Sequence, residues 1–500
     1  MNHALILPIL IPLFTGSLLL IRSQLSLTAK RWISLLATWA LLPLSAWLVL
    51  KADSGVLQIY ALGNWQAPFG IVLLLDRLAA LMLLVTAVLA SFAMLYAVRG
   101  DDERGPNFHA LMQFQLLGIN GAFLTGDLFN LFVFFEILLI ASYSLLVYGG
   151  GPKRIKAGMH YVVLNLVASS FFLIGVGMLY GLLGTLNMAD LALKVAEADP
   201  ERLPLVAAAG YLLLIVFGLK GAILPLYFWL PNAYASATAP VAALFAIMTK
   251  IGLYAVIRVF TLIYGSEAGE LAQLINYLLW PLAALTLAVG VIGALAARSL
   301  GRLIGYLVIV SVGTLLAGIS IGTEQSMSAA LYYLVHSTWV CGGLFLLADV
   351  VARQRGELGL RIRKGPQLLT PKLLSGLFFV GAISVAGLPP FSGFLGKLML
   401  LRSVETGWQA VVLWPAVLIG GLGMVIALAR AGTTLFWRCT AKSAPGAEFD
   451  RLRAFAAIAL LACGPLLVVG AQPISAYAQA TAQQLLNVDS YLQIVRGVGA

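Results

Sequence analysis

The chain has 500 residues, of which 61% are hydrophobic and only 10% are charged, and its mean hydropathy is +0.97. Soluble domains carry roughly 25% charged residues, so this composition excludes an ordinary soluble protein. The formal net charge of +11 could suggest a nucleic-acid partner, but nucleic-acid binders gather Lys and Arg on one face or arm. Here the basic residues lie in short gaps between apolar runs. We therefore expect a lipid bilayer around the chain and no nucleic acid.

Apolar runs long enough for a spanning helix of about 20 residues follow one another along the chain. Fourteen such runs lie at about residues 4–21, 32–50, 72–98, 108–125, 128–148, 159–183, 206–230, 236–263, 271–297, 302–322, 327–350, 373–400, 408–437 and 454–472. Their length excludes the alternating strands, about 10 residues each, of a membrane barrel. The first run lacks the basic segment and cleavage site of a secretory signal, so it is expected to remain as the first helix. The sequence predicts an all-α polytopic membrane protein with about 14 transmembrane helices in a single membrane domain, residues 1–500.

Positive charge alternates between the predicted loops. If the N-terminus lies outside, most Lys and Arg fall in loops that face the cytoplasm, including the segments 298–302 and 353–372, whereas the outside segments hold few. Cytoplasmic loops retain Lys and Arg, and one miscounted helix in the middle would destroy the alternation. We expect both termini on the outer face, with the final segment, residues 473–500, lying along the outer surface or frayed.

Two of the runs are interrupted by glycine and proline close to a lysine. The seventh run contains Gly218-Leu-Lys-Gly-Ala-Ile-Leu-Pro225, and the twelfth contains Gly387-Leu-Pro-Pro-Phe-Ser-Gly-Phe-Leu-Gly-Lys397. Broken helices at matching places in two halves indicate a transport site, because freed backbone groups and half-helix ends can serve ions there. Chance breaks also occur in membrane helices, so the pattern alone indicates a weak internal repeat.

Ionisable side chains stand inside the apolar runs. Glu136 lies near the middle of the fifth run, far from any other polar residue in its helix, and a mid-bilayer carboxylate costs at least about 2.5 kcal/mol on insertion scales. It therefore needs a partner or a proton, and the candidate partners are Lys220, Lys250 and Lys397 in three other runs. The remaining basic residues inside runs lie near helix ends, from which long side chains reach the headgroups: Arg77, Arg258 and Arg430.

These residue types suit proton transfer. Burial favours the neutral forms of lysine and glutamate, whereas a nearby opposite charge favours the charged forms. A lysine between a hydrophobic shell and a movable carboxylate can therefore hold or release a proton, which arginine cannot do because its pKa is too high. Inert ion pairs that set the helix register would use the same residue types. The sequence has one carboxylate and three lysines in four different spans, and two of the lysines lie at breaks. This distribution favours a proton relay over inert ion pairs.

A histidine extends this set. His336 lies in the eleventh run within Tyr332-Tyr-Leu-Val-His336-Ser-Thr-Trp339. Histidine exchanges protons near neutral pH, so His336 could link Lys250 to Lys397. A histidine in such a polar patch can equally be a hydrogen-bonded packing residue.

Other chemistry is not readable in the sequence. Cys341, Cys439 and Cys463 lie far apart without a CxxC pattern or neighbouring histidines, which argues against a disulfide, zinc or iron–sulfur site. No P-loop, dinucleotide fingerprint, haem pair or Ser/His/Asp set is found. We therefore expect no cofactor, no metal and no enzymatic reaction in this chain. Asp76 and Arg77 are expected to form a local pair at the membrane interface.

At the same buried residues the chain resembles the antiporter-like membrane subunits shared by respiratory complex I, membrane-bound hydrogenases and Mrp-type cation/proton antiporters. The matching stretches are Gly126-Asp-Leu-Phe-Asn-Leu-Phe-Val-Phe-Phe-Glu136, Leu219-Lys-Gly-Ala-Ile-Leu-Pro-Leu-Tyr-Phe-Trp-Leu-Pro231, Ala239-Pro-Val-Ala-Ala-Leu-Phe-Ala-Ile-Met-Thr-Lys250 and the segment 387–397. The resemblance spans nearly the whole chain. It implies two inverted five-helix repeats with broken helices 7 and 12, at roughly residues 108–263 and 271–437. Helices 1 to 3 in residues 1–107 would precede them, and helix 14 with an outer tail in residues 438–500 would follow.

The resemblance also implies roles for the buried residues, which in the family form a hydrated axis that carries protons. The family's fifth-helix carboxylate maps to Glu136, its broken-helix lysine to Lys220, its eighth-helix lysine to Lys250, its eleventh-helix histidine to His336 and its twelfth-helix residue to Lys397. The chain looks most like the D subunits of Mrp-type antiporters. One type of complex I subunit has glutamate where this chain has Lys397, and the largest members carry a long C-terminal extension that this sequence lacks.

On this basis we expect a proton-translocating subunit of a multisubunit Na⁺ or K⁺/proton antiporter, held with other subunits in a bacterial inner membrane. The rival interpretation is a proton-pumping membrane subunit of a complex I-like NADH-quinone oxidoreductase or of a membrane-bound hydrogenase. In that case electron transfer elsewhere would drive the same axis. A scaffold with inert ion pairs is the third hypothesis. For the antiporter hypothesis, the sequence does not distinguish Na⁺ from K⁺ as the transported cation.

Overall fold

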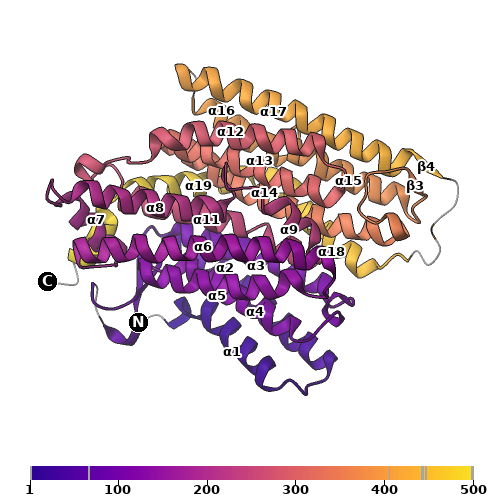
Figure 1. Cartoon of the computed structure of the whole chain (residues 1–500), viewed down its shortest axis with the longest axis horizontal. Coiled ribbons are helices and arrows are strands. Elements are labelled where there is room, and N and C mark those ends of the chain that lie inside the picture. Colours follow the sequence, from indigo (N-terminus) through magenta and orange to yellow (C-terminus); the bar gives the residue numbers. More distant parts are fainter. Residues whose placement is uncertain (1–2, 66–67, 405, 441–443, 445–447, 497–500) are drawn as a thin grey trace.

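Long helices run side by side and form most of the molecule (Figure 1). The computed structural model describes residues 3–65, 68–404, 406–440, 444 and 448–496. The helices of the first half are α1 (Leu7–Ile21), α2 (Leu27–Ala52), α3 (Arg77–Ala97), α4 (Phe108–Leu124), α5 (Leu128–Val147), α6 (Pro152–Leu183), α7 (Met188–Ala196), α8 (Leu203–Gly221), α9 (Leu230–Ser236), α10 (Ala239–Phe245) and α11 (Met248–Leu262). The helices of the second half are α12 (Asn276–Ala296), α13 (Leu300–Ile321), α14 (Glu324–Arg353), α15 (Pro371–Ala386), α16 (Ser392–Arg402), α17 (Trp408–Gly432), α18 (Arg451–Val469), α19 (Ala471–Leu486) and α20 (Asp489–Arg496). The strands are β1 (Gln58–Ala61), β2 (Val72–Leu75), β3 (Gly365–Pro366) and β4 (Cys439–Thr440).

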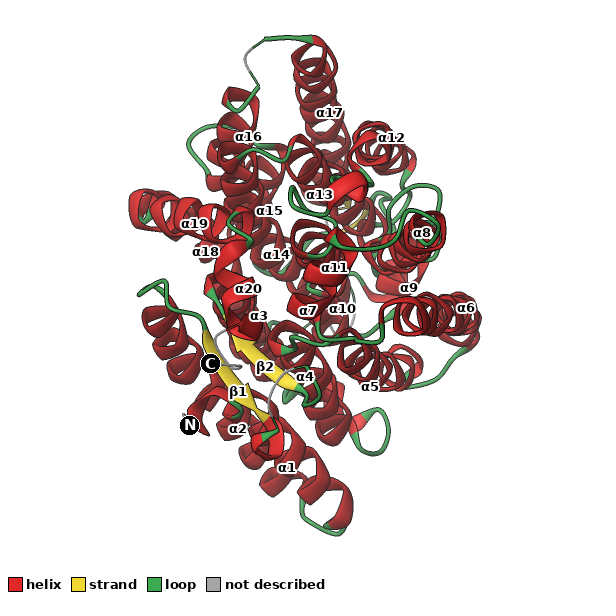
Figure 2. Ribbon diagram, turned by 90° about the vertical axis from the view of Figure 1, so that its left-hand side faces the viewer, coloured by secondary structure: helices red, strands yellow, loops and turns green. Residues whose placement is uncertain are grey.

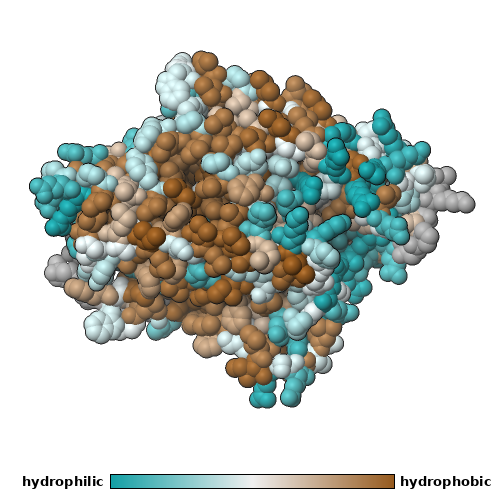
Figure 3. Space-filling model, in the orientation of Figure 1, coloured by the Kyte–Doolittle hydropathy of each residue, from teal (hydrophilic) through white to brown (hydrophobic). Residues whose placement is uncertain are grey.

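The all-α polytopic architecture is confirmed. Each of the fourteen predicted runs contains α-helix, and among the described residues eleven spans are long and apolar enough to cross a membrane. Two further apolar helices, α1 and α15, are shorter, so the count of fourteen crossings stays a prediction. An apolar belt covers the middle of the molecule, and hydrophilic side chains gather toward its ends, most densely where β3 and β4 lie (Figure 3).

The third run begins differently from the prediction. Its first residues form β2, which pairs antiparallel with β1 so that Val72 lies opposite Ala61. This hairpin lies at the end of the bundle seen in Figure 2. Helix α3 begins only at Arg77, because the Asp76 carboxylate accepts a hydrogen bond of 2.8 Å from the Ala79 amide and caps the helix. A short apolar stretch cannot be assigned to strand or helix by hydropathy alone.

The two predicted broken helices are present. In the seventh run α8 ends at Gly221 and the next helix, α9, begins only at the last residue of the run, Leu230; the twelfth run is divided into α15 and α16. Both breaks begin with a residue in the left-handed conformation, Ala222 at φ 56° and Gly387 at φ 80°. In both, the next amide bonds back to the helix that has just ended, Ile223 N to Gly218 O at 2.8 Å and Leu388 N to Ile383 O at 3.2 Å. The same C-terminal motif therefore interrupts both helices.

The backbone pairing around two helix junctions also repeats. At the α4–α5 junction, the amide of Leu128 donates to Leu186 O at 2.9 Å; at the α12–α13 junction, that of Leu300 donates to Leu360 O at 2.8 Å. The first junction pairs with the segment just before α7, and the second pairs with the segment before β3. Helix α7 and strand β3 lie at opposite ends of the bundle (Figure 1). The two repeats are thus inverted, while their predicted boundaries remain predictions.

A buried ion pair corrects two predictions about charged residues. Asp76 does not pair with its neighbour Arg77 but with Arg258 on α11, at 2.6 and 2.9 Å, and Tyr491 on α20 donates to the same carboxylate at 2.6 Å. Arg258 is only 2% exposed, so its side chain does not reach the headgroups. The carboxylate satisfies the guanidinium inside the protein, which removes the need for water.

The C-terminal segment is packed more firmly than predicted. Ala482 and Leu485 on α19 and Tyr491 on α20 are buried, and Gln484 donates to Gly55 O at 3.1 Å. Contacts of this kind hold the described part of the segment in place, so it is not frayed there, while its position along the outer surface stays a prediction. Residues 497–500 lie outside the described part of the chain.

Candidate functional site

Glu136 lies on α5 and is half-buried. Its Oε1 accepts a hydrogen bond from the Ser169 hydroxyl on the neighbouring helix α6. Within the described residues no ion pair joins this carboxylate to a lysine, so its direct contact is a hydroxyl. The lysine partner expected from the sequence stays a prediction.

Lys220 lies in the last turn of α8, directly before the first break. Its Nζ has no hydrogen-bond partner among the described residues and sits 5.1 Å from the ring centroid of Phe135, the residue next to Glu136. A cavity of about 10 Å³ adjoins the lysine and is also lined by Asn165 and Tyr161 of α6. This is close to the space that one water molecule needs, and Lys220, Asn165 and Tyr161 bring polar groups to a largely apolar lining. Lys220 thus faces both the glutamate helix and a site suited to a single water.

Lys250 is fully buried in the first turn of α11. The predicted eighth span is interrupted three residues before it, where Ala246 N bonds to Ala243 O at 3.1 Å and Ile247 N to Leu244 O at 3.2 Å. This break was not visible in the sequence because it contains neither glycine nor proline. Lys250 Nζ donates to Ser311 Oγ on α13 at 2.9 Å, so it reaches from the first predicted repeat into the second.

His336 lies in the middle of α14 and is 1% exposed. Its Nδ1 and the Ser392 hydroxyl at the start of α16 are 2.8 Å apart. Its Nε2 and the nearby Ser384 hydroxyl on α15 are both buried without a hydrogen-bond partner in the described residues. The histidine therefore meets both halves of the second broken helix.

Lys397 lies on α16, beyond the second break. Its Nζ donates to the carbonyl of Ala386, the last residue of α15, at 2.8 Å, and the C-terminal end of a helix carries partial negative charge that favours a cation. A Cβ on Gly387 would lie 2.6 Å from Lys397 Cδ, and the φ of 80° at this glycine is one that other residues rarely adopt. Glycine at this position thus makes room for the lysine.

The structure therefore buries the predicted lysines and histidine and half-buries Glu136, on helices around the two breaks, but no hydrogen bond or ion pair joins one of the five to another within the described residues. Hydroxyl groups contact three of them instead: Ser169, Ser311 and Ser392. These serines were not predicted from the sequence. Their only signal is a hydroxyl residue within an apolar helix, which is common in membrane helices for other reasons.

A second cluster of charges lies outside the membrane-spanning segments, between α3 and α4. Asp102 accepts hydrogen bonds of 2.6 and 2.8 Å from Arg31 and lies 3.0 Å from His109 Nε2. Burial alone would raise the pKa of Asp102, but the contacts with Arg31 and His109 outweigh it and hold the pKa at about 2. This carboxylate is thus a charged anchor between the first helices.

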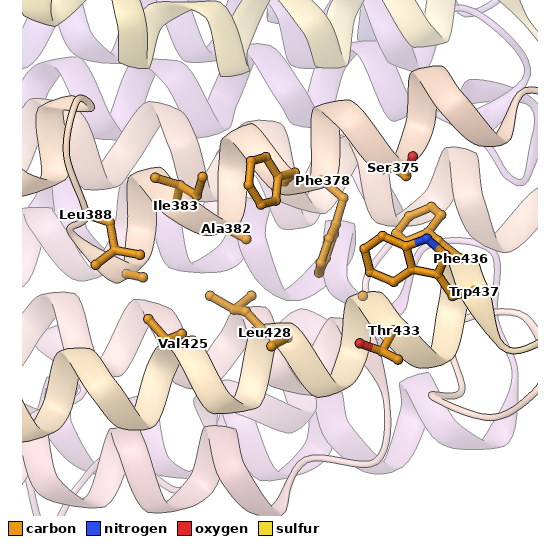
Figure 4. A pocket seen from close by; sticks show the side chains of 14 residues that line it. Ser375, Phe378, Ala382, Ile383, Leu388, Val425, Leu428, Thr433, Phe436 and Trp437 are labelled. Carbon is orange, nitrogen blue, oxygen red and sulfur yellow. The ribbon is translucent and has the colours of Figure 1, made fainter.

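An apolar groove between α15 and α17 lies apart from these groups (Figure 4). It encloses about 220 Å³ and is lined by residues such as Phe378, Ile383, Leu428 and Trp437. Such a lining suits a hydrocarbon chain or an apolar helix rather than an ion.

The fold and the buried groups define a polytopic membrane protein with two broken helices and cations inside its core. Residues 125–425 match the family described as NADH:quinone oxidoreductase/Mrp antiporter, TM. The chain belongs to this family.

Two curated relatives match over nearly the full length. The chain is 41% identical to the D subunit of the probable K(+)/H(+) antiporter of Rhizobium meliloti (strain 1021), covering 97% of this chain and 96% of the relative. It is 39% identical to the D subunit of the Na(+)/H(+) antiporter of Bacillus subtilis (strain 168), with 99% of both covered.

Solved structures of this architecture come from two kinds of complex. A chain of the Mrp complex from Dietzia sp. DQ12-45-1b aligns with a TM-score of 0.88 at 25% identity, over 99% of this chain and 100% of that one. A chain of the membrane-bound sulfane sulfur reductase, an archaeal respiratory membrane complex, aligns with a TM-score of 0.89 at 26% identity and the same coverage.

Proposed function

We propose that this chain is the proton-translocating subunit of a multisubunit monovalent cation/proton antiporter, with Na⁺ or K⁺ as the cation. The observation that carries the proposal is the set of five ionisable groups on five helices around the two breaks: Glu136, Lys220, Lys250, His336 and Lys397. Relatives named as antiporter D subunits over nearly their whole length support it. The chain would act with other subunits in a bacterial inner membrane, with both of its termini on the outer face.

In this proposal the charge of Glu136 sets the protonation of Lys220, which faces the glutamate helix. The Lys220 cavity has room for one water, which could pass a proton toward Lys250. Lys250 then passes the proton laterally through its contact with Ser311. His336, which contacts Ser392, carries the proton toward the second break. Lys397 exchanges protons with one face of the membrane or with a neighbouring subunit.

A proton-pumping role in a respiratory complex is the second candidate. The alignment with a chain of an archaeal respiratory membrane complex favours it, because the same axis could be driven by electron transfer in other subunits. The genes beside this one distinguish the two candidates. Small antiporter subunits would support the first, and quinone-reactive or iron–sulfur subunits the second.

The test of the relay is cation/proton exchange by the whole complex in everted membrane vesicles. Glu136→Gln and Lys220→Met each remove one proton carrier, and we expect exchange to slow roughly 100-fold, as when a positioned acid or base is removed. Lys194→Met is the matched control, because Lys194 is an exposed lysine paired with Asp190 on α7, outside the relay. Full activity of both relay variants at normal assembly would contradict the proposal. It would indicate that the buried charges have a structural role only.

A further inference from the structure

A strongly basic hollow opens at the end of the bundle where β3 lies. It encloses about 680 Å³ between the start of α6, the helix α9, the α12–α13 junction and the segment 357–363. These elements come from both predicted repeats. Figure 3 shows hydrophilic side chains gathered at this end of the molecule, next to the apolar belt.

The cations of the hollow have no anionic partners among the residues that the structure describes. Its lining includes five basic side chains against one carboxylate, that of Glu357: Lys153, Arg298, Arg302, Arg361 and Arg363. All five are exposed, and none forms an ion pair in the part of the chain that the structure describes. By contrast, Arg31 and Arg353, which lie outside the hollow, are each paired with aspartate at 2.6 Å. Five unpaired cations around one hollow repel each other, so an anion that enters it is attracted by all of them.

The backbone adds to this attraction. Helix α13, 22 residues long, begins at the hollow, with Ser299 as its cap, and the N-terminus of a helix carries partial positive charge that favours an anion. The pairing of Leu300 N with Leu360 O and of Ile362 N with Arg298 O, at 2.8 and 3.0 Å, holds the two basic segments beside each other. The backbone that carries Arg298 and Arg361 is therefore fixed at the edge of the hollow.

Helix α6, which lines the hollow, and helix α12, which ends two residues before its lining residue Arg298, carry exposed apolar side chains. On α6 these are Ile155 and Met159, at 54% and 59% exposure, and on α12 it is Ile292, at 64%. A free anion gains no stabilisation from apolar side chains beside its site. A phospholipid places its phosphate among basic residues and its acyl chains along apolar helices.

We propose that this hollow binds the headgroup of an anionic phospholipid. The phosphate lies among Arg298, Arg302 and Arg361 at the start of α13, and the acyl chains follow α6 or α12. The lipid then bridges α9, which follows the Lys220 break, and α13, which carries Ser311. This site is independent of the proton relay, since none of its residues belongs to the relay.

The test measures the thermal unfolding midpoint of the delipidated whole complex while phosphatidylglycerol, phosphatidylcholine or inorganic phosphate is added. The variant is Arg298→Gln with Arg302→Gln and Arg361→Gln. The matched control is Lys156→Gln with Lys364→Gln and Lys372→Gln, three exposed cations that do not line the hollow. The single variant Arg361→Gln gives a second, milder measurement.

We expect phosphatidylglycerol to raise the midpoint of the native complex and of the control, and phosphatidylcholine to do so much less. In the triple variant the apparent affinity for phosphatidylglycerol should fall at least roughly tenfold, and in Arg361→Gln by less. Equal losses in the variant and the control would overturn the proposal, because general surface charge would then suffice. A full shift with inorganic phosphate alone would overturn the lipid assignment. Loss of subunit assembly in the triple variant would overturn it as well, by showing that a protein partner fills the hollow.

Discussion

Lys250 on α11 donates a hydrogen bond of 2.9 Å to Ser311 on α13. The hydroxyl hydrogen of Ser311 is directed to Val308 O at 2.6 Å, which leaves its lone pairs to face the lysine. Both residues are buried. A cation of the first predicted repeat is therefore held by a hydroxyl of the second, and a proton leaving Lys250 in this direction meets Ser311 first.

Removal of this hydroxyl should slow cation/proton exchange. In Ser311→Ala the lysine loses its hydrogen-bond acceptor, and bonds to charged groups contribute about 1.5–3 kcal/mol, so we expect exchange by the whole complex in everted vesicles to fall roughly tenfold. Ser311→Thr keeps the hydroxyl and should retain most of the activity. The matched control is Ser320→Ala on the same helix, where the hydroxyl donates only to Ala317 O at 2.8 Å. A loss as large at Ser320 as at Ser311 would contradict the specific role of the Lys250 contact.

The close approach of Gly393 to His336 gives a second prediction. A Cβ on Gly393 would lie 1.9 Å from Ser384 O and 2.8 Å from His336 Nε2, so Gly393→Ala must displace the histidine or separate the halves of the broken helix. We expect exchange to fall at least roughly tenfold, since small misplacements of acting groups can be that costly. Gly376→Ala on α15 is the control, because a Cβ there has nothing within 4 Å. Native activity of Gly393→Ala would mean that the position of His336 does not matter.

The buried lysines and the two breaks at residues 218–225 and 387–397 were predictable because each depends on residue type alone. A charge in an apolar run is visible in any sequence, and so is a glycine–proline interruption. The break before Lys250 was not predictable, since it is made by a locally tightened backbone at Ala246 and Ile247. Likewise, hydropathy could not show that the segment 72–75 is a strand, because pairing with β1 decides it.

Contacts between distant segments could not be predicted from the sequence, for a different reason. Asp76 and Arg77 are neighbours in the chain, yet Asp76 pairs with Arg258 and Tyr491, a choice that depends on how α3, α11 and α20 pack. The direct contact of Glu136 could not be read from the sequence either. Charge complementarity suggested a lysine, whereas the packing of α5 on α6 presents Ser169.

The Asp76–Arg258 pair should be important for stability and separable from transport chemistry. Arg258→Met leaves a buried carboxylate without its cation, which costs about 3–5 kcal/mol when one partner of a buried pair is removed. We expect a clear fall in the thermal unfolding midpoint of the purified complex. Adding Asp76→Asn to the same variant should restore much of the loss, because the buried charge is then gone. Arg202→Met is the control, since its pair with Asp199 at 3.6 Å is exposed, and a comparable loss there would contradict the argument.

The anchor at Asp102 predicts a dependence on pH. Its pKa of about 2 lies below the ordinary value of 3.8, so the ionised carboxylate stabilises the fold above about pH 4, and this stabilisation is lost as the pH falls toward 2. We expect Asp102→Asn to lower the unfolding midpoint at neutral pH and the difference from the native protein to shrink below pH 4. Asp199→Asn, an exposed carboxylate, should show no such narrowing. A difference that is constant with pH would show that the amide disturbs packing instead of removing a charge.

The small cavity beside Lys220 supplies the last prediction. Asn165 lines this cavity together with the unpaired Lys220, and its amide donates to Tyr161 O at 2.8 Å. Asn165→Leu would replace this amide with an apolar group of similar size and remove the polar surroundings that a water molecule requires. If a water links Lys220 to the rest of the relay, exchange should slow at least roughly tenfold in Asn165→Leu, because a proton then has no carrier across the gap. Asn165→Ser, which keeps a hydroxyl and leaves more room, should retain most of the activity at equal assembly. Equal exchange in the leucine and serine variants would exclude this cavity from the proton path.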